Sequence, residues 1–337
     1  MSQQEVLHSM EWVESFVQDL HDKKQFKKAF IKVLKPIGKK RFEKAPFLSY
    51  PYQDAYSDDE SPMKYTAKSR QIGFTYNEMI DTLHDCITIE KYKKLLVSLT
   101  QPQANELLKV AYEAVDLLEE PYTIPFKVQR DTRLELHNGS RMIALPSTAS
   151  AARSFHGDVF IDEVAHIPKL ESLLEAIMQI TVRAGYNIEI GSSPFGQRGY
   201  FHQILKDAGW DTTRSWEKPQ DAKEFMREYH SFLKEYESEW SIHLVTWWMC
   251  GDLHWDRITA RANGDVLRQE YGIGFLDETT ALLPYELMKA RVNKKIIPYD
   301  PLKRYSRPEG SRLIFGIDPA ETVNQTALVV MQILNGV

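Results

Sequence analysis

The sequence predicts an α/β fold with a mainly parallel sheet and helices on both faces. Apolar strand segments alternate with helical segments between residues 63 and 190, a pattern that is typical of parallel sheets. Polar motifs follow several of these strands directly, and active sites in such sheets lie beyond the carboxyl ends of the strands. The composition, with 43% hydrophobic and 26% charged residues, is that of an ordinary globular protein.

Residues 1–45 are expected to form a basic helical segment. Apolar residues recur at helical spacing over 5–35, and Pro36 and Gly38 end the pattern. Residues 23–44 carry ten Lys or Arg side chains against one acid. This patch is either a solvated helix face or a surface that attracts phosphate inside an acidic protein of net charge −5.

The elements after residue 45 follow from apolar runs between punctuating residues. Segment 46–63 is rich in proline, tyrosine and acid, and is predicted to be a loop. Asn138 and Gly139 give the strongest hairpin signal and should join two short strands. The expected strands are 63–67, 95–99, 133–136, 142–145, 159–163 and 187–190, and the expected helices are 76–88, 104–118 and 170–184.

The chain is long enough for two domains. The character changes near residue 200, where helices rich in aromatic and charged residues surround a strand near 240–248. Two further strands are expected near the end, at 312–317 and 326–333. We therefore expect four parts: the basic segment 1–45, an α/β core at 46–200, a lid or linker subdomain at 201–308, and the start of another domain at 309–337.

Composition also excludes several classes of protein. No apolar run approaches the eighteen or so residues of a membrane span, and no secretory signal is present. Cys86 and Cys250 are the only cysteines, which supports neither a disulfide framework nor a cysteine-based zinc site. A reducing, cytoplasmic setting without membrane contact fits best.

The segment from Lys68 to Thr75 has the frame of a phosphate-binding loop. Gly73 and Thr75 stand where GxxxxGK[ST] requires them, but Phe74 replaces the lysine. Gly73 permits close backbone approach to phosphate, and Thr75 can offer its hydroxyl to Mg²⁺. Because Phe74 cannot bind phosphate ionically, we expect Arg70, or else Lys68, to supply the cation. The predicted nucleotide-binding loop comprises Lys68, Ser69, Arg70, Gln71, Ile72, Gly73, Phe74 and Thr75.

Two adjacent acids, Asp162 and Glu163, end an apolar strand and predict the catalytic centre. Asp162 would hold Mg²⁺, and Glu163 would polarise the attacking water. The alternative is that an acid caps the next helix. A cap explains one acid but explains two adjacent acids poorly, so the catalytic interpretation is favoured.

Two further motifs can serve the same site. Ser192 and Ser193 follow a strand and can sense the γ-phosphate by hydrogen bonding and transmit its loss to a moving segment. Their alternative is a turn ended by proline. Gln53 is a candidate for reading the adenine edge, with Tyr50 or Tyr52 stacking on the base, and its alternative is an ordinary loop glutamine.

Arg153 precedes the acidic strand by a few residues. An arginine at this place can point out of the subunit and act as a finger on a neighbour's nucleotide. Arg141 and Arg183 compete for that role, and a surface salt bridge is the alternative for all three.

Taken in order, these motifs resemble the large subunit of tailed-bacteriophage terminases, with the greatest likeness to the forms of Mu-like phages. The resemblance rests on Gln53 with its preceding tyrosine, 69–75, 97–101, 160–163, 191–194, 270–271 and 316–319. It implies a motor that uses ATP and Mg²⁺ to package double-stranded DNA into a procapsid. The implied architecture is a RecA-like P-loop ATPase with a lid subdomain, followed by an RNase H-like nuclease domain.

The resemblance also implies the partners and the setting. The implied partners are a portal protein and a terminase small subunit. The chain would form a homo-oligomeric ring, or be a monomer in isolation. It would act in the host cytoplasm and transiently at the portal vertex of the procapsid. Asp318 matches the first metal-binding carboxylate of the nuclease, but only Glu321 follows it among the acids. Two-metal hydrolysis needs several carboxylates, so we expect this truncated chain to lack nuclease activity.

Two other classes of function remain open. One is a helicase or remodelling ATPase with a similar core, which would separate strands. The other is a catalytically inactive scaffold, in which loss of the lysine abolished hydrolysis and left only partner binding.

Overall fold

The computed structural model describes Lys27 and residues 50–116, 124–148, 156–251, 253–276, 312–318 and 327–333. The chain divides into two compact units, residues 1–282 and 283–337, and each is described by itself. The helices predicted over 5–35 lie outside the described residues, apart from the single helical position Lys27.

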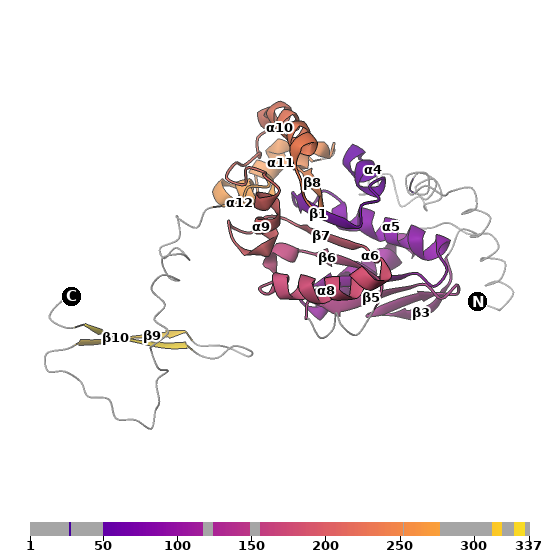
Figure 1. Cartoon of the computed structure of the whole chain (residues 1–337). Coiled ribbons are helices and arrows are strands. Elements are labelled where there is room, and N and C mark those ends of the chain that lie inside the picture. The colour runs from indigo at the N-terminus through magenta and orange to yellow at the C-terminus, as the bar shows by residue number, and fades with distance from the viewer. Residues whose placement is uncertain are drawn as a thin grey trace, which may run out of the picture. The chain divides into compact units, whose positions relative to one another are not determined.

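The first unit is built around one eight-stranded sheet (Figure 1). Its strand order is β3-β4-β5-β2-β6-β7-β1-β8. The six strands from β5 to β8 in this order run parallel, whereas β4 pairs antiparallel with both β3 and β5. The bounds are β1 Met63–Lys68, β2 Lys93–Ser98, β3 Phe126–Arg130, β4 Arg133–Leu136, β5 Arg141–Pro146, β6 Asp158–Asp162, β7 Ile188–Ser192 and β8 Ser241–Val245.

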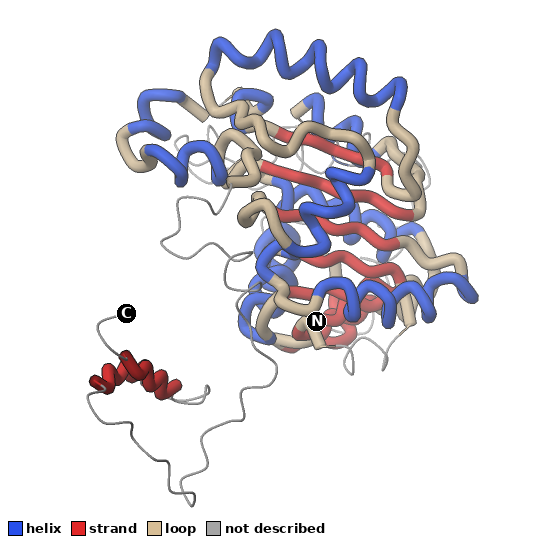
Figure 2. Tube along the Cα trace, turned by 60° about the vertical axis from the view of Figure 1, so that its left-hand side comes forward, coloured by secondary structure: helices blue, strands red, loops and turns tan. Residues whose placement is uncertain are grey.

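Helices cover both faces of this sheet, and Figure 2 shows the strands between them. The helices α5 and α6 pack on one face and α8 and α9 on the other, each with its own hydrophobic core. The bounds are α4 Pro51–Ser57, α5 Phe74–Thr88, α6 Gln101–Asp116, α8 Leu170–Ala184, α9 Gly199–Asp207, α10 Ala222–Glu235, α11 Trp255–Thr259 and α12 Gly264–Glu270, with 3₁₀ turns at Val164–His166, Pro219–Asp221 and Trp247–Met249. The predicted α/β class, with a mainly parallel sheet, is confirmed.

Alternation along each strand decides which side chain faces which layer. In β6, Phe160 is buried among α5 and α6, while Val159 and Ile161 are buried in the core that contains α8. Because both faces are covered, the central strands are apolar on both sides.

The predicted hairpin at Gly139 is also confirmed, and this residue has the positive φ of 86° that such a turn requires.

The segment 46–63, predicted to be a loop, instead contains the helix α4, and the prediction is wrong there. Pro51 stands at the first helical position, where its missing N–H is no loss and its fixed φ suits a helix. Gln53 reaches back so that its Oε1 accepts the backbone N–H of Tyr50 at 3.0 Å. Proline therefore starts a helix here and does not interrupt one.

The strand near 240–248 belongs to the main sheet. β8 pairs in parallel with β1, so that Lys68 lies opposite Val245. The segment 201–308, expected as a lid, therefore contributes a strand to the core sheet. The domain limits themselves stay a prediction.

In the second unit, β9 (Arg312–Asp318) and β10 (Ala327–Ile333) form an antiparallel pair. Asp318 is the last residue of β9 and pairs with Ala327. The two strands agree with the sequence prediction, whereas their identity as the start of a nuclease remains a prediction.

Candidate active site

Three parallel strands, β1, β6 and β7, bring polar residues to one edge of the sheet. Their carboxyl-terminal residues are Lys68, Asp162 and Ser192. The strand β7 lies between the other two: Ser192 pairs with Ala67 on one side, and Gly191 pairs with Asp162 on the other. The loop from Ser69 to Gly73 and the first turn of α5 follow β1 directly, which places the predicted phosphate loop at the same edge.

Lys68 joins the loop to the two acids. Its Nζ lies 2.9 Å from Glu163 Oε1 and 3.5 Å from Asp162 Oδ1. Burial alone would lower the pKa of this ammonium, but the two carboxylates outweigh burial and raise the pKa above its usual value. The side chain is only 7% exposed, so Lys68 is a buried, fully charged cation.

The hydroxyl of Thr75 donates to Asp162 Oδ2 at 2.8 Å. A hydroxyl beside a carboxylate is a hard oxygen pair of the kind that Mg²⁺ prefers, usually with substrate phosphates and water as its other ligands. Among the described residues, no group of three or more His, Cys, Asp or Glu is arranged to hold a metal. Thr75 and Asp162 therefore fit a magnesium ion that completes its shell with substrate and water.

Glu163 has the features of a catalytic group. Its backbone is in the left-handed region, with φ 53° and ψ 39°, which a non-glycine residue adopts at an energetic cost. Its carboxylate is 39% exposed, whereas that of Asp162 is 8% exposed. Burial would raise the pKa of Glu163, but Lys68, His166 and Ser192 together hold it below its usual range. Glu163 is thus ionised and open to solvent.

Phe74 is part of the core and does not face the site. Its ring is 2% exposed and packs against Tyr56 and Phe160 with centroid distances of 5.2 and 5.9 Å. A Cβ at Gly191 would lie 2.4 Å from Phe74 Cε1, so glycine in β7 makes room for this ring. Lys68 Nζ lies 5.8 Å from the ring centroid, within the range of a cation–π contact. Phe74 therefore connects the loop, the cation and β7.

Arg70 lies at the rim of the site. Its side chain is 62% exposed, and its Nε is 3.4 Å from Glu270 Oε2. The Arg70 backbone N–H donates to the carbonyl of Glu270 at 2.8 Å, and the hydroxyl of Ser69 donates to the carbonyl of Tyr271. These bonds tie the loop to the end of α12. The role of Arg70 as phosphate cation stays a prediction.

Gln53 lies beside the loop and not apart from it. It is 2% exposed, and its Nε2 donates to the carbonyl of Gly73 at 3.3 Å. The hydroxyl of Tyr52 donates to the carbonyl of Ile72, and the rings of Tyr50 and Tyr52 stack at 6.0 Å. The structure brings these residues to the phosphate loop, and the adenine contact remains a prediction.

Lys27 belongs to the basic segment, and its side chain is buried in the fold. Its buried ammonium donates to Asn77 Oδ1 at 2.7 Å and to Ser57, and it lies 3.3 Å from Asp81 Oδ1. This bond set joins residue 27 to α4 and α5. The remainder of the patch at 23–44 lies outside the described residues.

The other predicted residues are placed as follows. Ser192 Oγ donates to Glu163 Oε2 at 3.3 Å, so the predicted coupling serine contacts the predicted catalytic acid. Ser193 is buried next to it. Arg153 and the side chain of Arg183 lie outside the described residues.

A buried charge network lies under α5, and sequence reasoning missed it. Lys94 Nζ is 3.0 Å from Glu78 Oε1 and also contacts Glu189, while Lys64 Nζ is 3.1 Å from Glu189 Oε1. Burial, and then the neighbouring carboxylate of Glu189, raise the pKa of Glu78 to about 7. In the sequence, the signal for this network is the presence of Lys64, Lys94 and Glu189 within otherwise apolar strands.

Comparison with solved structures places the fold. The ATPase domain of the large terminase of Thermus phage P74-26 matches with a TM-score of 0.53 and 19% identity over 72% of this chain and 100% of that chain. A variant of the same domain matches with a TM-score of 0.52, 18% identity and the same coverage. The large terminase of a thermophilic bacteriophage in complex with ADP matches with a TM-score of 0.46 and 14% identity over 86% of this chain and 63% of that chain.

The described part of the first unit therefore shares its α/β fold with that terminase ATPase domain. No protein-family model matches the sequence, and no curated protein matches it. None of the described helices has the length and apolar character that crossing a membrane requires.

Proposed function

We propose that this chain is the ATPase portion of a bacteriophage terminase large subunit and drives double-stranded DNA into a procapsid. The observation that carries the proposal is the meeting of Lys68, Thr75, Asp162 and Glu163 at one edge of the sheet. A cation, a hydroxyl and two carboxylates at this place are the groups that phosphoryl transfer to water requires. The shared fold with a phage terminase ATPase domain supports the same assignment.

In this proposal the chain's residues divide the chemistry between them. Lys68 binds the β- and γ-phosphates, and Arg70 adds a second cation from the rim. Thr75 and Asp162 would hold Mg²⁺, which when bound would neutralise charge that develops on the phosphate oxygens. Glu163 orients the attacking water and accepts its proton. Gln53 holds the loop through the carbonyl of Gly73 and contacts the adenine edge.

The ion pair of Lys68 with Glu163 gives the site a way to respond to substrate. A triphosphate brings negative charge to Lys68 and competes with Glu163 for the ammonium. Loss of that ammonium raises the basicity of Glu163, because its pKa is held low largely by Lys68. The general base is therefore activated when the phosphates arrive.

Coupling to motion has two physical routes from the site. Ser192 contacts Glu163, so release of phosphate changes the bonding at the end of β7. Ser69 and Arg70 bond to the backbone of 270–271, so movement of the loop reaches α12. Both routes are short chains of direct contacts, and each can bias a two-state element.

The finer expectations belong to this proposal as well. Arg153 would act on the nucleotide of a neighbouring subunit in a homo-oligomeric ring, and the ring would engage a portal protein and a small subunit at the procapsid in the host cytoplasm.

The test measures Mg²⁺-dependent ATP turnover and strand separation side by side. We expect ATP hydrolysis, and no displacement of a labelled strand from a partial duplex, because a packaging motor moves along intact DNA. Strand displacement driven by ATP would identify a helicase instead. A chain that binds ATP with Mg²⁺ but never turns it over, even when assembled on a portal, would identify an inactive scaffold.

A further inference from the structure

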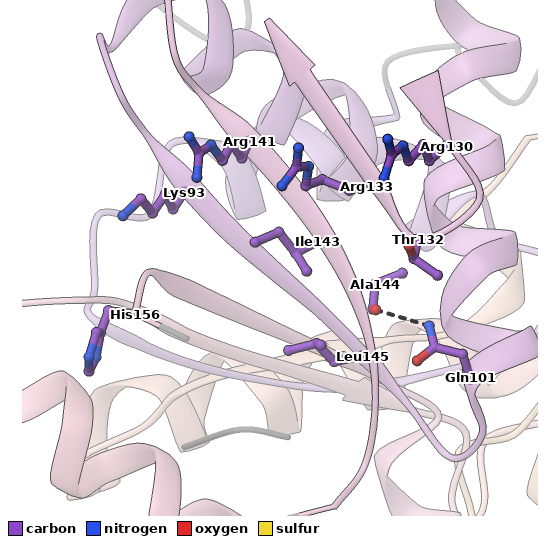
Figure 3. Close-up of a pocket in the computed structure, with 10 residues that line it drawn as sticks. All are labelled: Lys93, Gln101, Arg130, Thr132, Arg133, Arg141, Ile143, Ala144, Leu145 and His156. Atoms are coloured by element: carbon purple, nitrogen blue, oxygen red, sulfur yellow. Dashed lines mark hydrogen bonds between the residues drawn. The ribbon is translucent and has the colours of Figure 1, made fainter. Parts of the chain in front are cut away.

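A basic pocket lies away from the residues of the candidate active site. It has a volume of about 530 Å³ and lies over the β3–β4–β5 edge of the sheet (Figure 3). Ile143 and Leu145 contribute to its apolar floor. None of the ten described residues that line it is acidic, and Lys68, Thr75, Asp162 and Glu163 are not among them. The pocket therefore has a separate chemistry from the ATP site.

Four adjacent strands each contribute one cation to this pocket. They are Arg130 of β3, Arg133 of β4, Arg141 of β5 and Lys93 of β2, and Figure 3 shows the three arginines in a row. Arg130 pairs with Arg133 in the sheet register, and Arg141 pairs with Lys93, so each pair points to one face. Arg133 lies opposite Ile143, two residues along β5 from Arg141, so the row runs obliquely across the strands. Three strand intervals of about 4.8 Å and this offset of about 7 Å give the row a span of about 16 Å.

One buried acid organises two of these arginines. Glu135 is 4% exposed and lies 3.1 Å from Arg141 Nε and 3.5 Å from Arg133 NH2. Its ion pairs hold both guanidinium groups in place. The side chains of Arg133 and Arg141 are each still 39% exposed, so a ligand from solvent can reach both. Lys127, which lies 3.1 Å from Glu135, adds a further cation, so the excess of positive charge is preserved.

A row of cations of this length suits a ligand with several phosphates in line. A DNA strand carries one phosphate for about every 3.4 Å of helix axis, so about 16 Å along that axis presents several of them. A single phosphate cannot engage cations on four strands. Guanidinium groups also bind phosphate in a bidentate manner.

From this we infer that the pocket formed by Arg130, Arg133, Arg141 and Lys93 holds the phosphate backbone of DNA, as a second phosphate site distinct from the ATP site. The inference rests on the proposed function, because a packaging ATPase must bind the polymer that it moves. It assigns this DNA binding to one face of the β3–β4–β5–β2 edge. Because the cations reach phosphates and not bases, binding is independent of sequence and falls with salt.

The test uses the full chain and a labelled 20-base-pair duplex, with fluorescence anisotropy over a salt series. The deciding variant is Lys93→Gln with Arg130→Gln, because both side chains are exposed and neither contacts Glu135, so folding is preserved. The matched control is Lys109→Gln with Lys223→Gln, which removes two exposed cations elsewhere. Arg133→Gln with Arg141→Gln is a second variant, whose folding is checked by its Tm.

We expect the deciding variant to lower the slope of log K against log salt by about 0.9 for each phosphate that it no longer neutralises, and the control to leave the slope unchanged. ATP turnover without DNA should be unaltered in both. Unchanged DNA affinity and slope in the deciding variant, with normal ATP turnover, would overturn the pocket and leave the proposed function standing. Loss of tripolyphosphate binding with full retention of DNA binding would also overturn it, since the pocket would then hold a small anion.

Discussion

The ammonium of Lys68 lies 2.9 Å from Glu163 Oε1, although the two residues are 95 positions apart. The contact joins the predicted phosphate loop to the predicted catalytic acid and explains how a loop without the usual lysine keeps a buried cation. Lys68 is the last residue of β1, and its ammonium lies within 3.5 Å of both Asp162 and Glu163. A lysine in place of Phe74 would extend from the other end of the same loop.

The first prediction concerns the two cations of the loop. Lys68→Gln should weaken ATP binding by roughly 10- to 100-fold, the value of one charge-assisted hydrogen bond or two. Arg70→Gln should have the smaller effect, because the Arg70 side chain is 62% exposed. Equilibrium titration with a fluorescent ATP analogue in Mg²⁺ measures both. A larger loss for Arg70→Gln would return the main phosphate contact to Arg70.

The second prediction concerns the residue that replaces the usual lysine. Phe74→Lys should not supply a phosphate contact, because this side chain is buried among Tyr56, Phe160 and Gly191. It should lower the stability by about 3 kcal/mol or more, through removal of the ring and burial of a charge. Thermal unfolding and ATP turnover are the measurements, with Phe74→Leu as the control for ring loss. Recovery of ATP binding in Lys68→Gln by the added Phe74→Lys would contradict the account.

The third prediction concerns the space at Gly191. Gly191→Ala places a Cβ 2.4 Å from Phe74 Cε1 and should destabilise the protein by about 1–3 kcal/mol. It should also lower ATP turnover, because it displaces β7 next to Ser192. Phe74→Leu in the same chain should recover part of both losses, since the smaller side chain frees the space. Strictly additive effects in this double-mutant cycle would show that the two residues do not act on one another.

The fourth prediction concerns the pH dependence of the buried network. Burial and Glu189 raise the pKa of Glu78 to about 7, above its unfolded value of about 4.5. The folded state then binds more protons between these values, so the contribution of Glu78 to stability is full below pH 4.5 and is lost as pH rises through 7. Glu78→Gln removes this titration. Relative to the parent chain, Glu78→Gln should therefore raise the free energy of unfolding more at pH 8 than at pH 5.5, by on the order of 2 kcal/mol.

Chemical denaturation at the two pH values measures this difference. The neighbour Met79 offers a matched control, since Met79→Leu alters a buried side chain of the same helix α5 without removing a titrating group. An equal effect of Glu78→Gln at both pH values would mean that Glu78 is ionised throughout, paired with Lys94.

Local patterns were enough to predict the strands and the polar motifs at their ends. Asp162, Thr75 and Ser192 were found because a parallel sheet gathers the residues that follow its strands. The pattern does not tell in which direction a loop side chain points, so from the sequence both Arg70 and Lys68 are candidates for the phosphate cation. In the structure Lys68 contacts Glu163, whereas Arg70 contacts Glu270.

Two differences between prediction and structure have different causes. β8 joins the sheet beside β1, across more than 170 positions of sequence, and no local signal specifies such a pairing. The helix α4 has a local cause, because Pro51 stands at its first helical position, where proline favours a helix and does not interrupt one.

The central claim is that Lys68, Thr75, Asp162 and Glu163 form one ATP-hydrolysing centre, and Glu163→Gln tests it most directly. Quench-flow measurement of a single turnover, with ATP binding measured on the same sample, separates chemistry from affinity. We predict that Glu163→Gln binds ATP and Mg²⁺ about as well as the parent chain and loses nearly all hydrolysis. Hydrolysis at the parent rate in Glu163→Gln would contradict the account.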